Sequence, residues 1–251
     1  MEVKETQAHL LSLLKDFDTL CKANDINYSL HGGTMLGAIR EHGFIPWDDD
    51  LDITMTRVEY NKLASVINKY PDYRLVGKIK KQFQPKNDKR FWIDIFICDY
   101  ISEKTNEQKK KLNLLSVLDI ANRDAESIKL SNLNKYGFLK RVAFKTIYYI
   151  GHLFPKNIKV NKYLQVSEKK WIGNKTLMIR SNDQYVGRKI IFPACWYDGY
   201  VDVDFDNIKV PVIKAYHECL VTSYGEDYMT PIKYDHNEEV HNMLRSSDVN
   251  L

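Results

Sequence analysis

Four aspartates lie within a stretch of five residues: Asp48, Asp49, Asp50 and Asp52. If residues 47–53 are extended, Asp48, Asp50 and Asp52 point to one face and the hydrophobic residues between them point to the other. Two unit charges at ~4 Å repel each other by about 1 kcal/mol in water, and several times more strongly in a poorly solvated site. The cluster therefore predicts either a bound cation or carboxyl groups that keep their protons.

A fifth carboxylate, Asp94, interrupts the hydrophobic and strongly β-prone run 91–97. A lone carboxylate in a buried strand is costly unless it is paired, hydrogen-bonded or bound to metal. Hard oxygen ligands favour Mg²⁺ or Mn²⁺ over Zn²⁺. We therefore predict one or two such ions, with a metal-ligand set of Asp48, Asp50, Asp52 and Asp94. The candidate catalytic residues are Asp50, Asp52 and Asp94. The sequence leaves open whether Asp94 is a general base or a metal ligand.

A glycine pair precedes the aspartates, between a short strand at 28–30 and a short helix at 35–41 that Thr34 would cap. Glycine lets the backbone approach a ligand closely, and the free N–H groups at a helix start attract anions. The pattern predicts a phosphate site. Its candidate residues are His31, Gly32, Gly33, Thr34 and Arg40. Arg40 would make a bidentate contact to phosphate, whereas His31 could equally form a structural hydrogen bond.

Two further residues near the aspartates each have two interpretations. Trp47 would stack on a nucleobase or, more in keeping with its position, pack beneath the aspartate strand. Arg57 would contact a diphosphate or form a salt bridge. We keep both residues in the candidate substrate site.

The remaining elements must position these groups. Hydrophobic periodicity predicts helices at 6–23, 58–69, 103–129 and 215–224. Alternation or β-prone composition predicts strands at 73–80, 91–97, 176–179 and 189–192, and a hairpin of 200–205 with 208–212. Residues 81–90 are interpreted as a polar, basic loop. Helices mixed with strands, without an internal repeat or a linker, predict one α+β domain over residues 1–251.

The segment 131–165 differs in composition from its surroundings, because it combines interleaved aromatic and aliphatic residues with seven basic residues and no acidic one. The basic residues are Lys135, Lys140, Arg141, Lys145, Lys156, Lys159 and Lys162. The favoured interpretation is a helical insertion that buries its apolar face and exposes its basic face to solvent. Peripheral contact with an anionic membrane and binding of an anionic polymer are the alternatives.

Bulk composition excludes several classes of protein. The hydrophobic and charged fractions of 44% and 28% are those of an ordinary soluble globular protein rather than a disordered chain. The four cysteines are far apart and give neither a zinc ribbon nor a disulfide framework. There is no signal-peptide pattern at the N-terminus and no apolar run of the ~20 residues that span a bilayer. We expect a cytoplasmic protein, for which a peripheral position at the inner face of the membrane is the alternative location. We expect no nucleic-acid partner.

Taken together, these motifs resemble a known family. His31-Gly-Gly-Thr-Met-Leu-Gly-Ala-Ile-Arg40 and Gly43-Phe-Ile-Pro-Trp-Asp-Asp-Asp-Leu-Asp-Ile53 are similar to the signature of the LicD family of phosphotransferases, relatives of fukutin and fukutin-related protein. Trp92–Phe96, Phe192–Trp196 and Tyr224–Met229 resemble later markers of the family. After residue 231 the chain departs from the family pattern, so we expect no role for its last histidines.

The resemblance implies a nucleotidyltransferase-like fold, in which a mixed β-sheet is flanked by helices. It implies transfer of phosphocholine, or of a similar alcohol phosphate, from a CDP-activated donor to a sugar hydroxyl. The acceptor would be a cell-surface glycan such as a teichoic acid, capsule or lipopolysaccharide, or its lipid-linked precursor. By the same resemblance, Asp48, Asp50, Asp52 and Asp94 match metal-binding carboxylates. Choline, ethanolamine, glycerol and ribitol all remain open as the donor's head group.

Two other functions remain open. A nucleotidyltransferase would move a nucleotidyl group from a nucleoside triphosphate to a phosphorylated alcohol or sugar, and would release pyrophosphate instead of CMP. A non-catalytic membrane or polymer adaptor built on 131–165 would turn over no nucleotide. The dense carboxylate set argues against the adaptor, because a binding module has no use for such repulsion.

Overall fold

The computed structural model describes residues 2–124 and 137–231, which form a mixed β-sheet flanked by helices. The strands of the sheet run in the order β1-β2-β5-β4-β3, and β6 extends it by pairing with β5 and β7. Their bounds are β1 Ser29–Leu30, β2 Asp52–Thr56, β3 Tyr73–Val76, β4 Lys81–Pro85, β5 Ile93–Ile101, β6 Leu177–Arg180 and β7 Ile191–Pro193. Only β2 and β5 pair in parallel among these strands. The α+β class and the mixed sheet are confirmed.

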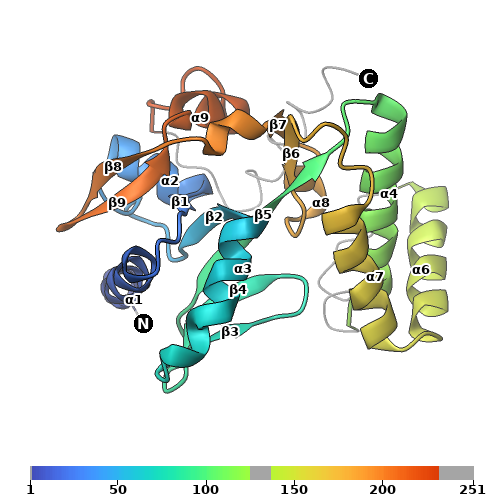
Figure 1. Cartoon of the computed structure of the whole chain (residues 1–251), viewed down its shortest axis with the longest axis horizontal. Helices are drawn as coiled ribbons and strands as arrows, with labels where there is room; N and C mark the ends of the chain where they lie inside the picture. Colours follow the sequence, from blue (N-terminus) through green and yellow to red (C-terminus); the bar gives the residue numbers. More distant parts are fainter. Residues whose placement is uncertain (1, 125–136, 232–251) are drawn as a thin grey trace.

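Helices lie on both sides of this sheet and beyond its β6 end (Figure 1). Their bounds are α1 Val3–Ala23, α2 Gly32–Arg40, α3 Arg57–Val66, α4 Thr105–Asn122, α6 Phe138–His152, α7 Lys156–Lys169, α8 Tyr185–Arg188 and α9 Tyr216–Tyr224. Short 3₁₀ turns follow α3 at Ile67–Lys69 and follow β7 at Ala194–Tyr197. None of these described helices is long and apolar enough to cross a membrane.

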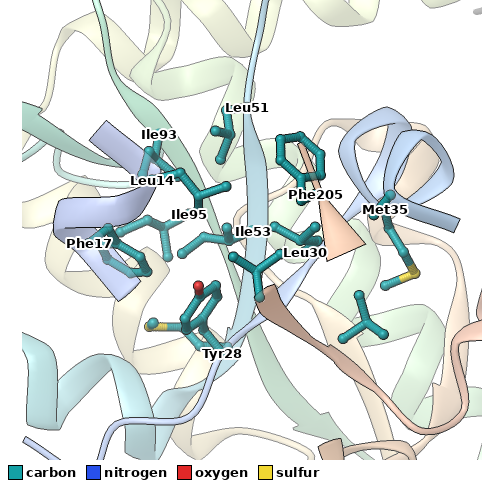
Figure 2. Packing of buried hydrophobic residues seen from close by; sticks show 14 of the residues in the cluster. Leu14, Phe17, Tyr28, Leu30, Met35, Leu51, Ile53, Ile93, Ile95 and Phe205 are labelled. Carbon is teal, nitrogen blue, oxygen red and sulfur yellow. The ribbon is translucent and has the colours of Figure 1, made fainter. Parts of the chain in front are cut away.

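The main core lies between α1 and one face of the sheet (Figure 2). Phe17 of α1 packs edge-on against Phe83, at 5.0 Å between ring centroids, and against Tyr28, at 5.1 Å. Ile53 and Ile95, which are paired in register on β2 and β5, are buried in this cluster. Since side chains alternate along a strand, their neighbours Asp52 and Asp94 must point to the opposite face.

A second hydrophobic cluster joins α4 and α7 to the far end of β5 and to β6. Lys111 of α4 ties these elements together, because its buried ammonium donates to the carbonyls of Tyr100, at 2.6 Å, and Ser167, at 2.7 Å. Helix α6 is the outermost of the three helices (Figure 1). It packs tightly on α4, because a Cβ on Gly151 would lie 2.6 Å from the Cβ of Ala121.

The predicted hairpin is present as β8 Tyr200–Phe205 and β9 Ile208–Ile213. Its turn places Asp206 in the left-handed region, at φ 52°, a conformation that aspartate tolerates better than most residues. The hairpin docks on β1, where the N–H of Ile213 donates to the hydroxyl of Ser29 at 3.0 Å.

Several local predictions were wrong. The strand predicted over 73–80 ends at Val76, where Gly77 follows with φ 84°. Residues 81–85 form β4 instead of a loop; Phe83 is fully buried and the strand pairs on both sides, with β3 and β5. Helix α2 starts at Gly32, so Thr34 lies inside the helix and does not cap it. The aspartate strand begins only at Asp52, because the N–H of Asp48 closes a turn onto the carbonyl of Ile45 at 2.9 Å. The shared face of Asp48, Asp50 and Asp52 therefore does not arise from a strand.

The prediction of helices in the basic segment is confirmed by α6 and α7. Residues 131–136, with Lys135, lie outside the described part of the chain, as does the end of the helix predicted over 103–129. The last histidines, at 236 and 241, also lie outside it.

Candidate active site

Asp52 and Asp94 are direct neighbours across the parallel pair β2 and β5. Three hydrogen bonds fix the backbone around them. The N–H of Asp52 donates to the hydroxyl of Thr34 at 3.0 Å, and its carbonyl accepts from the N–H of His31 at 2.9 Å. The N–H of Asp94 donates to the carbonyl of Leu51 at 2.9 Å. The two carboxylates therefore project from a well-ordered part of the sheet. They lie on two different strands, as the sequence predicted.

The carboxylate of Asp94 is held by two side-chain donors. Gln82 Nε2 donates to one oxygen at 2.9 Å, and Trp92 Nε1 donates to the other at 3.1 Å. Gln82 stands opposite Asp94 in the register of β4 and β5, so the antiparallel pairing brings it there. Both bonds restrain the orientation of the carboxylate toward the site.

The start of α2 lies directly against the aspartates. A Cβ on Gly33 would lie 2.7 Å from a carboxylate oxygen of Asp48, and a Cβ on Gly32 would lie 3.4 Å from an oxygen of Asp52. Gly32 also has φ +56°, which most other residues adopt only with strain. The glycine turn that was predicted to face phosphate therefore contacts the carboxylates themselves. The positive end of the helix dipole favours their negative charge.

The electrostatics of the site are dominated by like charge. Burial raises the pKa of Asp52 well above its ordinary value, and the negative charges of Asp50, Asp94, Asp48 and Asp183 raise the pKa further, in that order. Burial and nearby negative charge raise the pKa because both destabilise the ionised form of the carboxyl group. A bound cation would relieve this repulsion.

The chemistry of the donors fits a hard divalent cation, since the available side-chain ligands are carboxylate oxygens. Within residues 2–124 and 137–231, however, no three His, Cys, Asp or Glu side chains converge into a finished coordination shell. Mg²⁺ or Mn²⁺ at Asp48, Asp50, Asp52 and Asp94 therefore stays a prediction.

His31 forms the wall of the site next to Asp52. It precedes the first residue of α2 with an extended backbone, and its ring packs edge-on against Phe96 at 5.1 Å. Burial, and then the positive charge of Arg180, hold the pKa of His31 well below its ordinary value. The imidazole is therefore neutral at physiological pH. The hydrogen bond to Asp52 comes from the backbone N–H of His31, so contact of the ring with phosphate and a structural hydrogen bond of the ring both stay predictions.

Comparison with known proteins agrees with this geometry. Residues 25–116 match the family model described as LicD/FKTN/FKRP, nucleotidyltransferase domain. The chain is also 27% identical over 252 residues to the lipopolysaccharide cholinephosphotransferase LicD of Haemophilus influenzae, covering 91% of this chain and 92% of that protein. The chain belongs to the LicD family. The matched range contains α2, β2, β4 and β5, and hence His31, Gln82 and both paired aspartates.

Two uncharacterized proteins share shorter stretches with this LicD family member. One, from Rickettsia prowazekii, is 36% identical over 89 residues, which are 35% of this chain and 32% of that protein. The other, from Rickettsia typhi, is 52% identical over 68 residues, which are 27% of this chain and 21% of that protein. Each of these similarities therefore covers about a third of this chain or less.

Two arginines predicted for the LicD phosphate site are not brought to it. Arg40 is at the far end of α2, roughly 12 Å along the helix from Gly32, and it contacts Glu41 at 2.7 Å and the carbonyl of Tyr228 at 3.2 Å. Arg57 follows the opposite end of β2 from Asp52, roughly 16 Å along the strand. Its guanidinium makes a bidentate contact with Asp99, at 2.9 and 2.6 Å, which is the salt bridge that the sequence left as the alternative.

Two other predicted residues stay near the aspartates in different roles. The hydroxyl of Thr34 accepts the N–H of Asp52, so it orders the aspartate strand. The side chain of Trp47 remains 41% exposed next to the acidic turn. Packing beneath the strand does not cover it, and stacking on a nucleobase stays a prediction.

Sequence reasoning missed the loop that follows β6. The side-chain oxygen of Asn182 accepts the N–H of Ile97 at 2.6 Å, and its amide donates to the carbonyl of Ile95 at 2.8 Å. These bonds fill the gap on β5 between β4 and β6 and place the charge of Asp183 near Asp52. A cavity of about 80 Å³ opens there, lined by Lys80, Lys81, Asp94, Ile95, Phe96, Asn182 and Gln184.

The missed residues had weak signals in the sequence. Lys81 and Gln82 stood in a stretch interpreted as a loop. Asp183 lies in an ordinary polar turn. The hydroxyl of Tyr224 would be 3.8 Å from a Cβ on Gly32. Tyr224 belongs to the motif that resembles a LicD marker, and this resemblance was the signal that could have linked it to the site.

Proposed function

We propose that this LicD family member transfers phosphocholine, or a similar alcohol phosphate, from a CDP-activated donor to a sugar hydroxyl of a cell-surface glycan or its lipid-linked precursor. The observation that carries the proposal is the Asp52 and Asp94 pair beneath the glycine start of α2. It occurs in a chain that aligns with the Haemophilus influenzae cholinephosphotransferase over most of both proteins.

The reaction exchanges one phosphoester partner for another. The bond breaks between the phosphorus of the alcohol phosphate and the oxygen that bridges it to CMP, so that CMP leaves with the electron pair. The acceptor hydroxyl forms the new P–O bond and loses its proton to a carboxylate of the Asp52 and Asp94 pair. A carboxylate within hydrogen-bond reach of the hydroxyl is a suitable base for this step.

Each residue near the pair has a separate task in this proposal. Gln82 and Trp92 hold the Asp94 carboxylate in one orientation, and Thr34 with His31 fixes the backbone of Asp52. Such restraint keeps reacting groups in a productive geometry and contributes to rate. Asp48, Asp50, Asp52 and Asp94 would hold Mg²⁺ or Mn²⁺, which when bound neutralises charge on the transferred phosphoryl group.

Lysines close to Asp94 are suited to the donor. Lys80 and Lys81 line the cavity beside Asp94, and the Lys80 ammonium would pair with a diphosphate there. The Lys81 ammonium has other partners, because it donates to the carbonyl of Gly77 at 3.0 Å and lies 5.6 Å from the centre of the Tyr60 ring. Burial lowers the pKa of Lys81, as does the nearby charge of Arg57, whereas Glu168 raises it.

The test measures CMP release from CDP-choline in the presence of Mg²⁺ and a glycan acceptor. We expect Asp52→Asn and Asp94→Asn each to reduce the rate by at least about a hundredfold, within the range that a positioned acid–base group contributes. Asp72→Asn, an exposed change in a turn before β3, serves as the matched control. Full turnover by both site variants would contradict the mechanism.

The products also distinguish the alternative functions. Pyrophosphate released from a nucleoside triphosphate would identify a nucleotidyltransferase, in keeping with the name of the domain in the family model. No turnover of any CDP-alcohol or triphosphate would favour an adaptor. Substituting CDP-ethanolamine, CDP-glycerol and CDP-ribitol for CDP-choline identifies the head group.

A further inference from the structure

The outer face of α6 carries an exposed apolar stripe, although a soluble helix normally turns such a stripe toward the core. Its members and exposed fractions are Leu139 81%, Val142 46%, Tyr149 67%, Ile150 52% and Leu153 81%. They recur at the three- and four-residue spacing that defines one face of a helix. The opposite face, with Gly151, packs on α4. The stripe therefore faces away from the molecule, on its outermost helix (Figure 1).

The apolar surface continues from α6 onto α7. Phe154 in the connecting turn and Ile158 in the first turn of α7 are 55% and 60% exposed. Between them and α4 lies a groove of about 330 Å³, whose lining includes Val117, Leu118, Ile147, Ile150, Phe154 and Lys162. Contiguous exposed apolar surface of this kind marks an interaction site for a protein or a membrane.

Charge on the same surface restricts the choice of partner. From 137 to 167 the chain contains six basic residues and no acidic one. Exposed lysines border the apolar surface, with Lys145 on α6, Lys156 at the start of α7 and Lys162 beside the groove. The partner must therefore offer an apolar layer and negative charge together.

An anionic phospholipid bilayer meets both requirements. A second copy of the chain would place two positively charged faces against each other, which their repulsion disfavours. A soluble polyanion would pair with the lysines but would leave the leucines and aromatic side chains in water. We propose that the outer face of α6, with the α6–α7 turn, docks peripherally on an anionic bilayer, its apolar stripe in the acyl boundary and its lysines at the headgroups.

The proposal does not depend on the phosphotransfer chemistry, because none of its residues belongs to the carboxylate site. It is tested by sedimentation of the whole protein with vesicles of phosphatidylglycerol and phosphatidylethanolamine in equal parts, and with vesicles of phosphatidylcholine alone. We expect at least about tenfold stronger partitioning onto the anionic vesicles, and weakening of that binding as salt screens the headgroup charge.

Two variants separate the apolar contribution from the charge contribution. Leu139→Glu combined with Leu153→Glu should reduce partitioning by about tenfold or more, because it puts charge into the apolar stripe. Lys145→Gln combined with Lys162→Gln should reduce it by a similar factor while leaving the stripe intact. Val58→Glu on α3, where Val58 is 61% exposed, is the matched control and should bind as the wild type does.

Three results would overturn the proposal. One is equal binding of the wild type to anionic and phosphatidylcholine vesicles. Another is unchanged binding of the lysine variant. Its substitutions are exposed and polar and leave folding intact, so the test stays valid if the glutamate variant fails to fold. The third is a lipid-free wild type that sediments as a dimer while the Leu139 and Leu153 variant is a monomer, since that would assign the stripe to a second copy of the chain.

Discussion

Asp52 occupies a position where its charge opposes folding. Its carboxylate is desolvated and faces the negative charges of Asp50 and Asp94, and repulsion of this kind lowers the free energy of unfolding. We therefore expect Asp52→Asn to make the metal-free protein more stable while abolishing phosphotransfer. A gain of about 1 kcal/mol corresponds to a Tm increase of roughly 2–4 °C for a chain of this length.

Thermal denaturation in a chelating buffer checks this expectation, with the exposed Asp72→Asn as the control for simple loss of charge. Opposite changes in stability and activity are typical of functional residues. A Tm of the Asp52→Asn protein equal to or below that of the control would show that the carboxylate cluster is already neutralised by its surroundings.

Gly33 is a second position at which function restricts the residue type. A Cβ there would lie 2.7 Å from a carboxylate oxygen of Asp48, closer than real contacts allow, so Gly33→Ala must displace that carboxylate. Because the backbone of Gly33 is in an ordinary helical conformation, stability should change by no more than about 1 kcal/mol. We expect divalent-ion affinity, measured by calorimetry, to fall by about tenfold; an unchanged affinity would remove Asp48 from the ligand set.

Ala38 within the same helix provides the comparison for Gly33→Ala. Ala38→Gly is also a glycine–alanine exchange in α2, and it should lower stability by about 1 kcal/mol or somewhat more while leaving ion binding intact. The pair of variants thus separates the effect of helix propensity from the effect of contact with the aspartate.

At the residue scale, the sequence predicted those site residues whose chemistry is concentrated locally. The aspartates, the glycine pair and Asp94 each stand out, because charge or chain flexibility is unusual in their immediate context. Gln82 and Asp183 do not, since their roles come from strand pairing and from a loop far along the chain. Arg40 and Arg57 matched a phosphate-binding residue type, but their positions at the far ends of α2 and β2 bring them to other partners.

At the element scale, periodicity predicts elements well where one side is buried and the other faces water. Helix α1 follows this rule and was predicted. Strand β5 has no exposed residue, and it was predicted from its β-prone composition instead. Strand β4 has polar residues on most of its length, and only its pairing on both sides, with Phe83 buried, makes it a strand. Such pairing is a tertiary effect that outweighs local propensity.

Lys111 connects three elements through a buried ammonium, and this gives a pH-dependent prediction. Burial lowers the pKa of Lys111 from 10.5 to about 8, partly offset by the charge of Asp99. In the unfolded chain the lysine keeps its proton up to its ordinary pKa, so the unfolded state binds more protons between pH 8 and 10.5. The contribution of Lys111 to stability therefore rises with pH in that window, by about 3 kcal/mol at most.

Below pH 8 both states are charged, so the burial penalty is constant there. Lys111→Met removes the titration but leaves the carbonyls of Tyr100 and Ser167 without this donor, at a pH-independent cost of about 1–3 kcal/mol each. Urea denaturation measures the free energy of unfolding of both proteins. We expect the value for the wild type to increase relative to that for the variant as pH rises from 8 toward 10. Parallel pH profiles of the two proteins would rule out a depressed pKa.

At the scale of the whole molecule, the carboxylate site and the apolar face of α6 belong to different parts of the structure. The site lies on the part of the sheet formed by β2, β4 and β5, whereas α6 lies beyond α4 at the edge of the molecule (Figure 1). The composition of 131–165 predicted the helices, but the prediction that their apolar face is buried was wrong for α6. The helix buries the face with Gly151, and so leaves its longer apolar side chains exposed.

The site itself depends on the whole fold, which leads to a prediction for ligand binding. Its groups come from His31 in the first part of the chain to Tyr224 near the end of the described residues, so they meet only in the native state. A ligand that binds there must stabilise global folding, by about 2.7 kcal/mol at a concentration of a hundred times its Kd. For a chain of this length we expect a Tm increase of roughly 5–10 °C.

Thermal denaturation with Mg²⁺ and each CDP-alcohol in turn measures this increase and ranks the donors. CDP-choline should give the largest shift if the head group matches that of the Haemophilus influenzae relative. The same ligand should shift the Asp94→Asn protein much less, because that variant lacks one of the two paired carboxylates, whereas Val58→Glu should respond as the wild type does. A shift produced by CMP alone, equal to that of every CDP-alcohol, would mean that the site recognises the nucleotide and that choice among donors arises only when the acceptor hydroxyl is present.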